Sequence, residues 1–140
     1  MAALLVILAA GVAAGTSRAS SPAFRVIVNP ANASPALDRR FLTEVFLKRN
    51  TRWPTGELIR PVDQGTDSSV RRRFSEDVLN RSVAAVKSYW QQMIFSGRAI
   101  PPPELDSDEE VIRYVAKFPG AVGYISGTGE LAGVKAVALR

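Results

Sequence analysis

The chain has 140 residues, which is enough for one domain, and its composition, 46% hydrophobic and 22% charged, is typical of a globular protein. It contains no cysteine and no histidine, which excludes cysteine nucleophiles, Ser-His-Asp relays and the usual zinc, haem and iron–sulfur sites. The formal net charge is +5, and the segment 39–98 holds 12 Lys and Arg against 6 Asp and Glu. A basic middle is typical both of a surface that meets an anionic partner and of an ordinary solvated face.

The first 19 residues have the composition of an export signal. Residues 2–14 form an uncharged apolar run, shorter than the roughly 20 residues that span a bilayer but suited to the core of a signal peptide. Ser17 and Ala19 place small residues where a cleavage site needs them. We therefore expect residues 1–19 to be a signal peptide. Residues 20–140 would then form one periplasmic or secreted domain that meets the membrane only through the cleaved segment.

The mature chain begins with a strand pattern followed by a helix pattern. The β-branched stretch 24–28, closed by Asn29-Pro30, predicts a strand. Ser34-Pro35 predicts the start of a helix that runs to Arg49, with a buried face formed by Leu37, Phe41, Leu42, Val45 and Phe46. Trp53 is expected to fold over this helix. Residues 58–62 predict a second strand, and Pro61 indicates that this strand either lies at the sheet edge or ends early.

Three more helices and two more strands are predicted after the polar loop 62–70. Val70, Phe74 and Val78 share one helix face, and the break at 80–82 separates this helix from a second one with the apolar stripe Val83, Val86, Trp90, Met93 and Ile94. Gly97 predicts the end of that helix, and the proline-rich segment 99–104 predicts an extended loop. The acidic run 106–110 suits the first turn of the third helix. Strands are expected over 121–126 and 134–139.

The predicted order of elements is β-α-β-α-α-α-β-β. Strands that alternate with helices predict an α/β domain, with a mixed or largely parallel sheet flanked by helices. In such sheets ligands bind where the carboxyl end of a strand leads into a helix N-terminus. The loop 62–70 lies at such a junction, and it is therefore the candidate site.

Several stretches together resemble the phosphate-type substrate-binding proteins of ABC transporters, which have the type II periplasmic binding protein fold. Residues 45–48 with Trp53 are similar to the family's IF-x-G-K-x-x-x-W element, residues 59–69 to its strand and phosphate loop, and residues 119–124 to its PG-x-IGY turn and strand. The loop here, VDQGTDSSVRRRF, has fewer glycines than the family's RSDGSGTT. Family members have two lobes that close on the ligand. The resemblance therefore implies a single-lobe or minimal member of this fold.

The candidate oxyanion donors in the loop are Thr66, Ser68, Ser69 and Arg71. A helix N-terminus leaves backbone N–H groups unpaired, hydroxyls add donors, and a guanidinium bonds an oxyanion bidentately. The resemblance implies in addition that a carboxylate, Asp63 or Asp67, accepts the proton of hydrogen phosphate. The alternative at this loop is an ordinary helix cap made by Thr66 or Asp67, followed by solvated arginines.

Two functions are consistent with these residues, and neither is catalytic. The first is capture of phosphate or a similar small oxyanion, linked to ABC-type phosphate uptake. The second is a degenerate binding-protein lobe that serves as a protein-interaction module in the cell envelope, where its basic middle docks onto the membrane component of a transporter or another envelope protein. No cofactor, metal or nucleic acid is expected, because the run 106–110 matches no calcium loop and the aromatic residues lie on core stripes.

Overall fold

The structure is a computed structural model that describes residue 15 and residues 20–140. Apart from Gly15, the predicted signal peptide lies outside the described residues, so its assignment stays a prediction. Among the residues that the structure describes, the helices and strands lie between Phe24 and Leu139. In this described part of the chain, no helix combines the length and the apolar character that crossing a bilayer requires.

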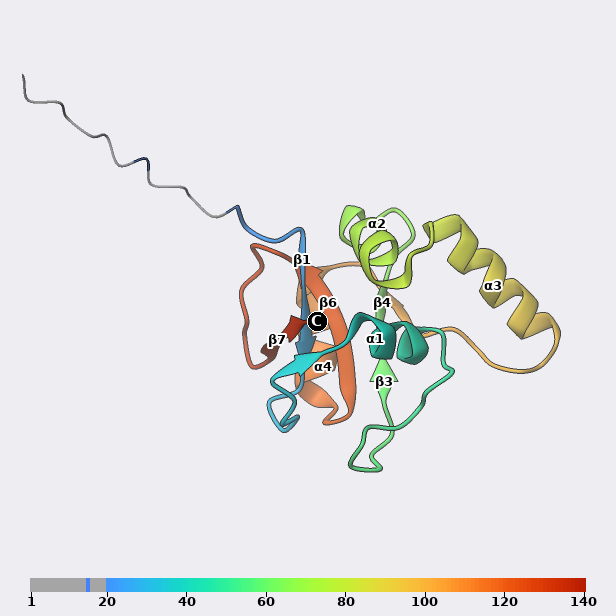
Figure 1. The fold of residues 1–140 in the computed structure, drawn as a ribbon, viewed down its shortest axis with the longest axis horizontal. Helices are drawn as coiled ribbons and strands as arrows, with labels where there is room; N and C mark the ends of the chain where they lie inside the picture. The colour runs from blue at the N-terminus through green and yellow to red at the C-terminus, as the bar shows by residue number, and fades with distance from the viewer. Residues whose placement is uncertain (1–14, 16–19) are drawn as a thin grey trace, which may run out of the picture.

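A mixed five-stranded sheet forms the centre of the fold (Figure 1). In spatial order its strands are β2 (Ala36–Leu37), β7 (Lys135–Leu139), β1 (Phe24–Val28), β6 (Ala121–Ser126) and β3 (Arg60–Pro61). β1 is antiparallel to both β6 and β7, whereas β2 and β3 run parallel to their neighbours. The mixed sheet is confirmed, and so is the edge position of the strand that contains Pro61.

Helices cover both faces of the sheet. One face carries α1 (Arg39–Phe46), α2 (Ser69–Phe74) and the π-helical turn η1 (Ser75–Leu79), and the other carries α4 (Asp108–Lys117). Strand residues alternate between the two layers because successive side chains of a strand point to opposite faces. Val26 and Tyr124 belong to the core beneath α1 and α2, whereas Ile27 and Ile125 pack with Val111 of α4.

The helix α3 (Val83–Phe95) is buried at only two positions. Val86 and Trp90 are in the core, and Figure 1 shows the helix extending away from the sheet. The predicted apolar stripe is confirmed at these two residues but is wrong at Ile94, whose exposed fraction is 53%. As predicted, the helix ends before Gly97, which has a φ of 69°.

The first helix begins later than predicted. Ala36 and Leu37 form β2, which pairs with the last strand, and α1 begins only at Arg39. Trp53 folds over α1 as predicted. Its ring centroid lies 5.6 Å from that of Phe41, and its Nε1 donates a hydrogen bond of 3.0 Å to the carbonyl oxygen of Gly120.

Gly123 in β6 allows α4 to approach the sheet closely. A Cβ atom at this position would lie 2.8 Å from a Cγ1 atom of Val111 and 2.8 Å from one of Val62. We expect Gly123→Val to lower the free energy of unfolding by about 3 kcal/mol, measured by urea denaturation, because the added atoms overpack this contact. Ala138→Val, at an exposed position of β7, is the control and should change stability by less than about 0.5 kcal/mol. Equal effects would contradict close packing at Gly123.

Candidate functional site

The loop 65–69 joins β4 (Asp63–Gln64) to α2, at the carboxyl end of a strand as predicted. β4 pairs in parallel with β5 (Glu104–Leu105), and this second, two-stranded sheet was not predicted. An open hollow of about 430 Å³ lies beside this loop and is lined by Gly65, Thr66, Asp67, Ser68, Glu104 and Asp106. This volume is in the range of known ligand pockets.

Ser68 is the N-cap residue of α2. Its Oγ accepts a hydrogen bond of 3.2 Å from the backbone N–H of Arg71 and donates one of 2.7 Å to Oε1 of Gln64. The helix is therefore not capped by Thr66 or Asp67, which was the alternative considered from the sequence. The hydroxyl of Ser68 therefore makes both of these hydrogen bonds within the protein, and they stabilise the conformation of the loop.

Thr66 and Ser69 present free polar groups at the loop surface. Both residues are exposed, and their hydroxyls have no hydrogen-bond partner among residues 20–140. The same holds, within this part of the chain, for the backbone N–H groups of Ser69 and Val70 at the start of α2. Unpaired N–H groups are ordinary at a helix start, and together with the hydroxyls they supply several donors on one side of the loop.

Arg71 is buried beneath the loop, with an exposed fraction of 4%. Its guanidinium lies 3.5 Å from the carboxylate of Asp63 and donates a hydrogen bond of 2.7 Å to the carbonyl oxygen of Gln64. It also donates one of 2.6 Å to Oε1 of Glu104, a residue whose side chain is 46% exposed and lines the hollow. Arg71 is not among the residues that line the hollow, whereas Glu104, which accepts its hydrogen bond, is. Arg72 and Arg73 are exposed.

Asp63 and Tyr124 form the inner end of this cluster. Asp63 is 5% exposed, and its Oδ1 accepts hydrogen bonds from the Tyr124 hydroxyl and from the backbone N–H of Gln64. Burial raises the pKa of Asp63 above its ordinary value, although the charge of Arg71 acts in the opposite direction. Burial, with the neighbouring carboxylate, also raises the pKa of Tyr124, so the phenol keeps its proton and donates it. Of the two carboxylates considered for hydrogen phosphate, Asp67 lines the hollow and Asp63 does not.

Asp108 connects the start of α4 to the same region. Its carboxylate accepts hydrogen bonds from the Ser126 hydroxyl at 2.6 Å and from Nε2 of Gln64 at 3.0 Å. Ser107 caps α4, and the acidic residues fill its first turn as predicted. In the part of the chain that the structure describes, no group of three or more acidic side chains is placed to hold a metal ion.

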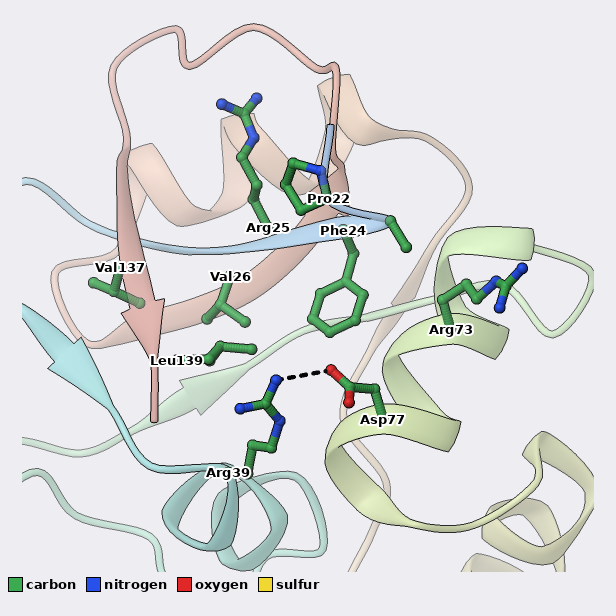
Figure 2. Close-up of a pocket in the computed structure, with 10 residues that line it drawn as sticks. Pro22, Phe24, Arg25, Val26, Arg39, Arg73, Asp77, Val137 and Leu139 are labelled. Atoms are coloured by element: carbon green, nitrogen blue, oxygen red, sulfur yellow. Dashed lines mark hydrogen bonds and ion pairs between the residues drawn. The ribbon is translucent and has the colours of Figure 1, made fainter. Parts of the chain in front are cut away.

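A larger hollow, of about 520 Å³, lies on the α1 side of the sheet (Figure 2). Its lining combines apolar and charged residues, among them Phe24, Val26, Val137 and Leu139 with Arg25, Arg39, Arg73 and Asp77. Its rim carries the ion pair between Arg39 and Asp77, at 3.1 Å, and Figure 2 shows Arg25 pointing away from this pair. This hollow lies apart from the loop that the sequence indicated, so the hollow beside the loop 65–69 is kept as the candidate site.

Sequence reasoning missed Glu104 and Tyr124 as members of the site. Glu104 lies 33 positions from Arg71 and follows three prolines in a segment predicted to be an extended loop. Tyr124 lies in a predicted strand, but no local pattern indicates which buried partner its hydroxyl meets. Only the tertiary pairing of β4 with β5 and the packing of α2 on β6 bring these side chains to Arg71 and Asp63.

No protein-family model matches the chain, and neither does any curated protein. Solved structures do match. An ABC-type phosphate transport receptor from Vibrio cholerae has a TM-score of 0.64 and 22% sequence identity, with 84% of this chain matched to 46% of that one. A Clostridium perfringens protein described as a phosphate ABC transporter substrate-binding protein, solved with bound phosphate, has a TM-score of 0.65 and 18% identity over 84% and 44% of the two chains. PstS from Borrelia burgdorferi has a TM-score of 0.61 and 14% identity over 84% and 47%.

These matches establish the fold of this chain. The chain has the α/β fold that forms a part of each of these phosphate ABC transporter proteins. The resemblance seen in the sequence is therefore confirmed for the fold. The chain spans less than half the length of each of these receptors. The structural neighbours are binding receptors and not enzymes.

The cap at Ser68 can be tested with two neighbouring serines. We expect Ser68→Ala to lower the free energy of unfolding by about 1 kcal/mol, because α2 loses its N-cap. Ser69→Ala, one residue later and exposed, should change it by less than about 0.5 kcal/mol. Urea denaturation of the two variants measures the difference, and equal losses would contradict the assignment of the cap.

The raised pKa of Asp63 makes stability depend on pH. A carboxyl group with a native pKa above its unfolded value binds its proton more tightly in the native state. Ionising it therefore costs stability as the pH rises from the ordinary value near 3.8 through the native pKa. We expect the free energy of unfolding of the wild type, relative to Asp63→Asn, to fall with pH across this window and then to level off. Urea denaturation at a series of pH values measures it.

The control for this pH series is Asp77→Asn, which removes an exposed carboxylate from α1's ion pair with η1. The free energy of unfolding of the wild type relative to Asp77→Asn should show no comparable decline with pH. A wild-type advantage over Asp63→Asn that grows with pH would show that Arg71 and Tyr124 outweigh the burial of Asp63.

Proposed function

We propose that this chain is a non-catalytic binding lobe that takes up phosphate or a similar small oxyanion in the hollow beside the loop 65–69. The observation that carries the proposal is the position of Glu104. Its carboxylate is bound to the buried guanidinium of Arg71 at 2.6 Å, yet the side chain is 46% exposed at the wall of the hollow. A phosphate group offers a guanidinium the same kind of oxygen acceptor. The exposed carboxylate of Glu104 therefore marks the place where a ligand oxyanion would bind.

The other predicted donors surround this position in the proposed complex. Thr66 and Ser69 contribute hydroxyls, and the start of α2 contributes unpaired N–H groups. Ser68 holds the loop through its cap and its bond to Gln64. Asp67 accepts the proton that hydrogen phosphate carries and repels sulfate, which has no proton to donate. The acidic wall also lowers the affinity that one lobe can reach by itself.

The likeness to phosphate receptors supports an exported protein that works with an ABC-type phosphate transporter, in agreement with the predicted signal peptide. The chain matches less than half of those receptors, so residues 20–140 supply one wall of the proposed site. The membrane component of the transporter is the partner that this role implies.

Calorimetric titration of residues 20–140 with phosphate and with sulfate tests the proposal. We expect phosphate to release heat with the wild type and sulfate to bind less tightly. Glu104→Gln should raise the affinity for phosphate about tenfold, or about 1.4 kcal/mol, because the competing charge on Arg71 is removed. Arg71→Ala should abolish the heat.

The matched control is Glu109→Gln, which removes one exposed carboxylate outside the hollow. It should leave the affinity for phosphate within about twofold, since surface charges that lie apart are screened by salt. Circular dichroism establishes that each variant is folded. If Glu104→Gln and Glu109→Gln change the affinity equally, the ligand does not bind at Arg71.

The second candidate function is the non-catalytic protein-interaction module. It is favoured by the internal pairing of Arg71 and Ser68 and by the three carboxylates around the hollow, of Asp67, Glu104 and Asp106. No heat from either the wild type or Glu104→Gln at millimolar phosphate would exclude the oxyanion site and leave this function. Arg72 and Arg73, exposed on α2, are then the first residues to substitute in a search for the protein partner.

A further inference from the structure

Exposed apolar side chains gather at the end of α3. Within residues 20–140 the large hydrophobic side chains that are exposed are Leu58, Ile94, Phe95, Ile100 and Leu131. Three of them fall within residues 94–100, here called the α3 tip. The exposed fractions are 97% for Phe95, 70% for Ile100 and 53% for Ile94. Single exposed apolar residues are ordinary on protein surfaces, but a group of them on one projecting turn indicates a binding surface.

The α3 tip is an ordered turn. The N–H of Gly97 donates to the carbonyl oxygen of Ile94, and the N–H of Arg98 donates to that of Met93, each at 3.0 Å. With Gly97 at a φ of 69°, these two bonds form a Schellman motif, which ends a helix in a defined geometry. The backbone of the turn therefore holds Ile94 and Phe95 in their exposed positions.

The tip also stands apart from the rest of the molecule. Figure 1 shows α3 extending away from the sheet and the chain turning back at the end of this helix. Three large apolar side chains on one turn expose less area than the roughly 800 Å² per partner that a stable protein–protein interface buries. A lipid interface has no such requirement, since its acyl chains rearrange around an inserted side chain.

The charges of this region complement an anionic surface. Residues 80–103 contain the basic residues Arg81, Lys87 and Arg98 and no acidic residue. Lys87 and Arg98 are exposed, and Arg98 belongs to the tip itself. Basic residues beside exposed aromatic and aliphatic side chains are the combination by which proteins bind anionic membranes peripherally.

We propose that the α3 tip inserts Ile94, Phe95 and Ile100 into the interface of an anionic lipid membrane, with Lys87 and Arg98 at the headgroups. This is a membrane contact in addition to the predicted signal segment, and it does not depend on the oxyanion site. It would hold the folded domain at the membrane surface after cleavage of the signal.

Vesicle flotation tests the proposal with residues 20–140, so that the apolar segment 2–14 is absent. We expect binding to vesicles of phosphatidylglycerol and phosphatidylcholine, and much weaker binding to phosphatidylcholine alone or at high salt. Phe95→Ser should lower the partition coefficient about tenfold or more, because the burial of one aromatic side chain is lost. Because Phe95 is almost fully exposed, thermal unfolding of this variant should match the wild type.

Two matched controls separate the tip from general surface effects. Leu131→Ser removes an exposed apolar side chain between β6 and β7, and Arg113→Glu reverses an exposed charge on α4. At the tip itself, Arg98→Glu reverses a charge and should reduce vesicle binding, as Phe95→Ser should. Neither of the two control variants should reduce it comparably. Phe95→Trp gives a direct signal of insertion, since its fluorescence should be quenched by brominated acyl chains, whereas Trp53 and Trp90 are buried in the core.

Three results would overturn the proposal. The first is an absence of binding to the anionic vesicles. The second is binding that Phe95→Ser leaves unchanged, or fluorescence of the Phe95→Trp variant that brominated lipids do not quench. The third is a concentration-dependent dimer in sedimentation that Phe95→Ser dissolves, because the tip would then be covered by a second copy of the chain.

Discussion

The buried pair between Arg71 and Asp63 is the interaction that holds the candidate site together. It joins α2 to β4, and through Glu104 and Tyr124 it extends to β5 and β6. The loop 65–69 is therefore placed by an electrostatic cluster beneath it, and its own turn residues adjust to that position. Gln64 contributes to the same support, because its backbone and side chain bond to Arg71, Tyr124 and Asp108.

The same pairing sets the chemical character of the hollow. A guanidinium that faced the hollow alone would make a strong anion site, whereas this one is shared among a carboxylate inside, a carbonyl group and a carboxylate at the surface. The positive charge is thus nearly neutralised before any ligand arrives. What remains for a ligand is exchange with one exposed side chain and contact with unpaired hydroxyl and N–H groups. Stability of the loop and strength of the anion site therefore oppose each other at Arg71.

The parts of the fold that depend on local pattern were predictable, whereas those that depend on distant pairing were not. The β-branched stretch 24–28 indicated β1, and a tryptophan beside a helix was placed correctly at Trp53. Leu37 matched a helix face but lies in β2, because pairing with the last strand outweighs the local signal. Ile94 continued an apolar stripe, but it is exposed because α3 extends beyond the core that it covers. Arg71 belonged to a run of three arginines, and nothing in that run distinguishes the buried one from its two exposed neighbours.

The central position of β1 affects when the molecule can fold. Its two neighbours in the sheet are β6 and β7, and Phe24 is paired with Ser126, roughly 100 residues later in the chain. A nascent chain in which β6 and β7 have not yet been synthesised has no partner for this strand on either side. Neither hydrophobic layer can close in such a chain, because both use residues of β6. The order of strands thus delays folding until β6 and β7 have been synthesised.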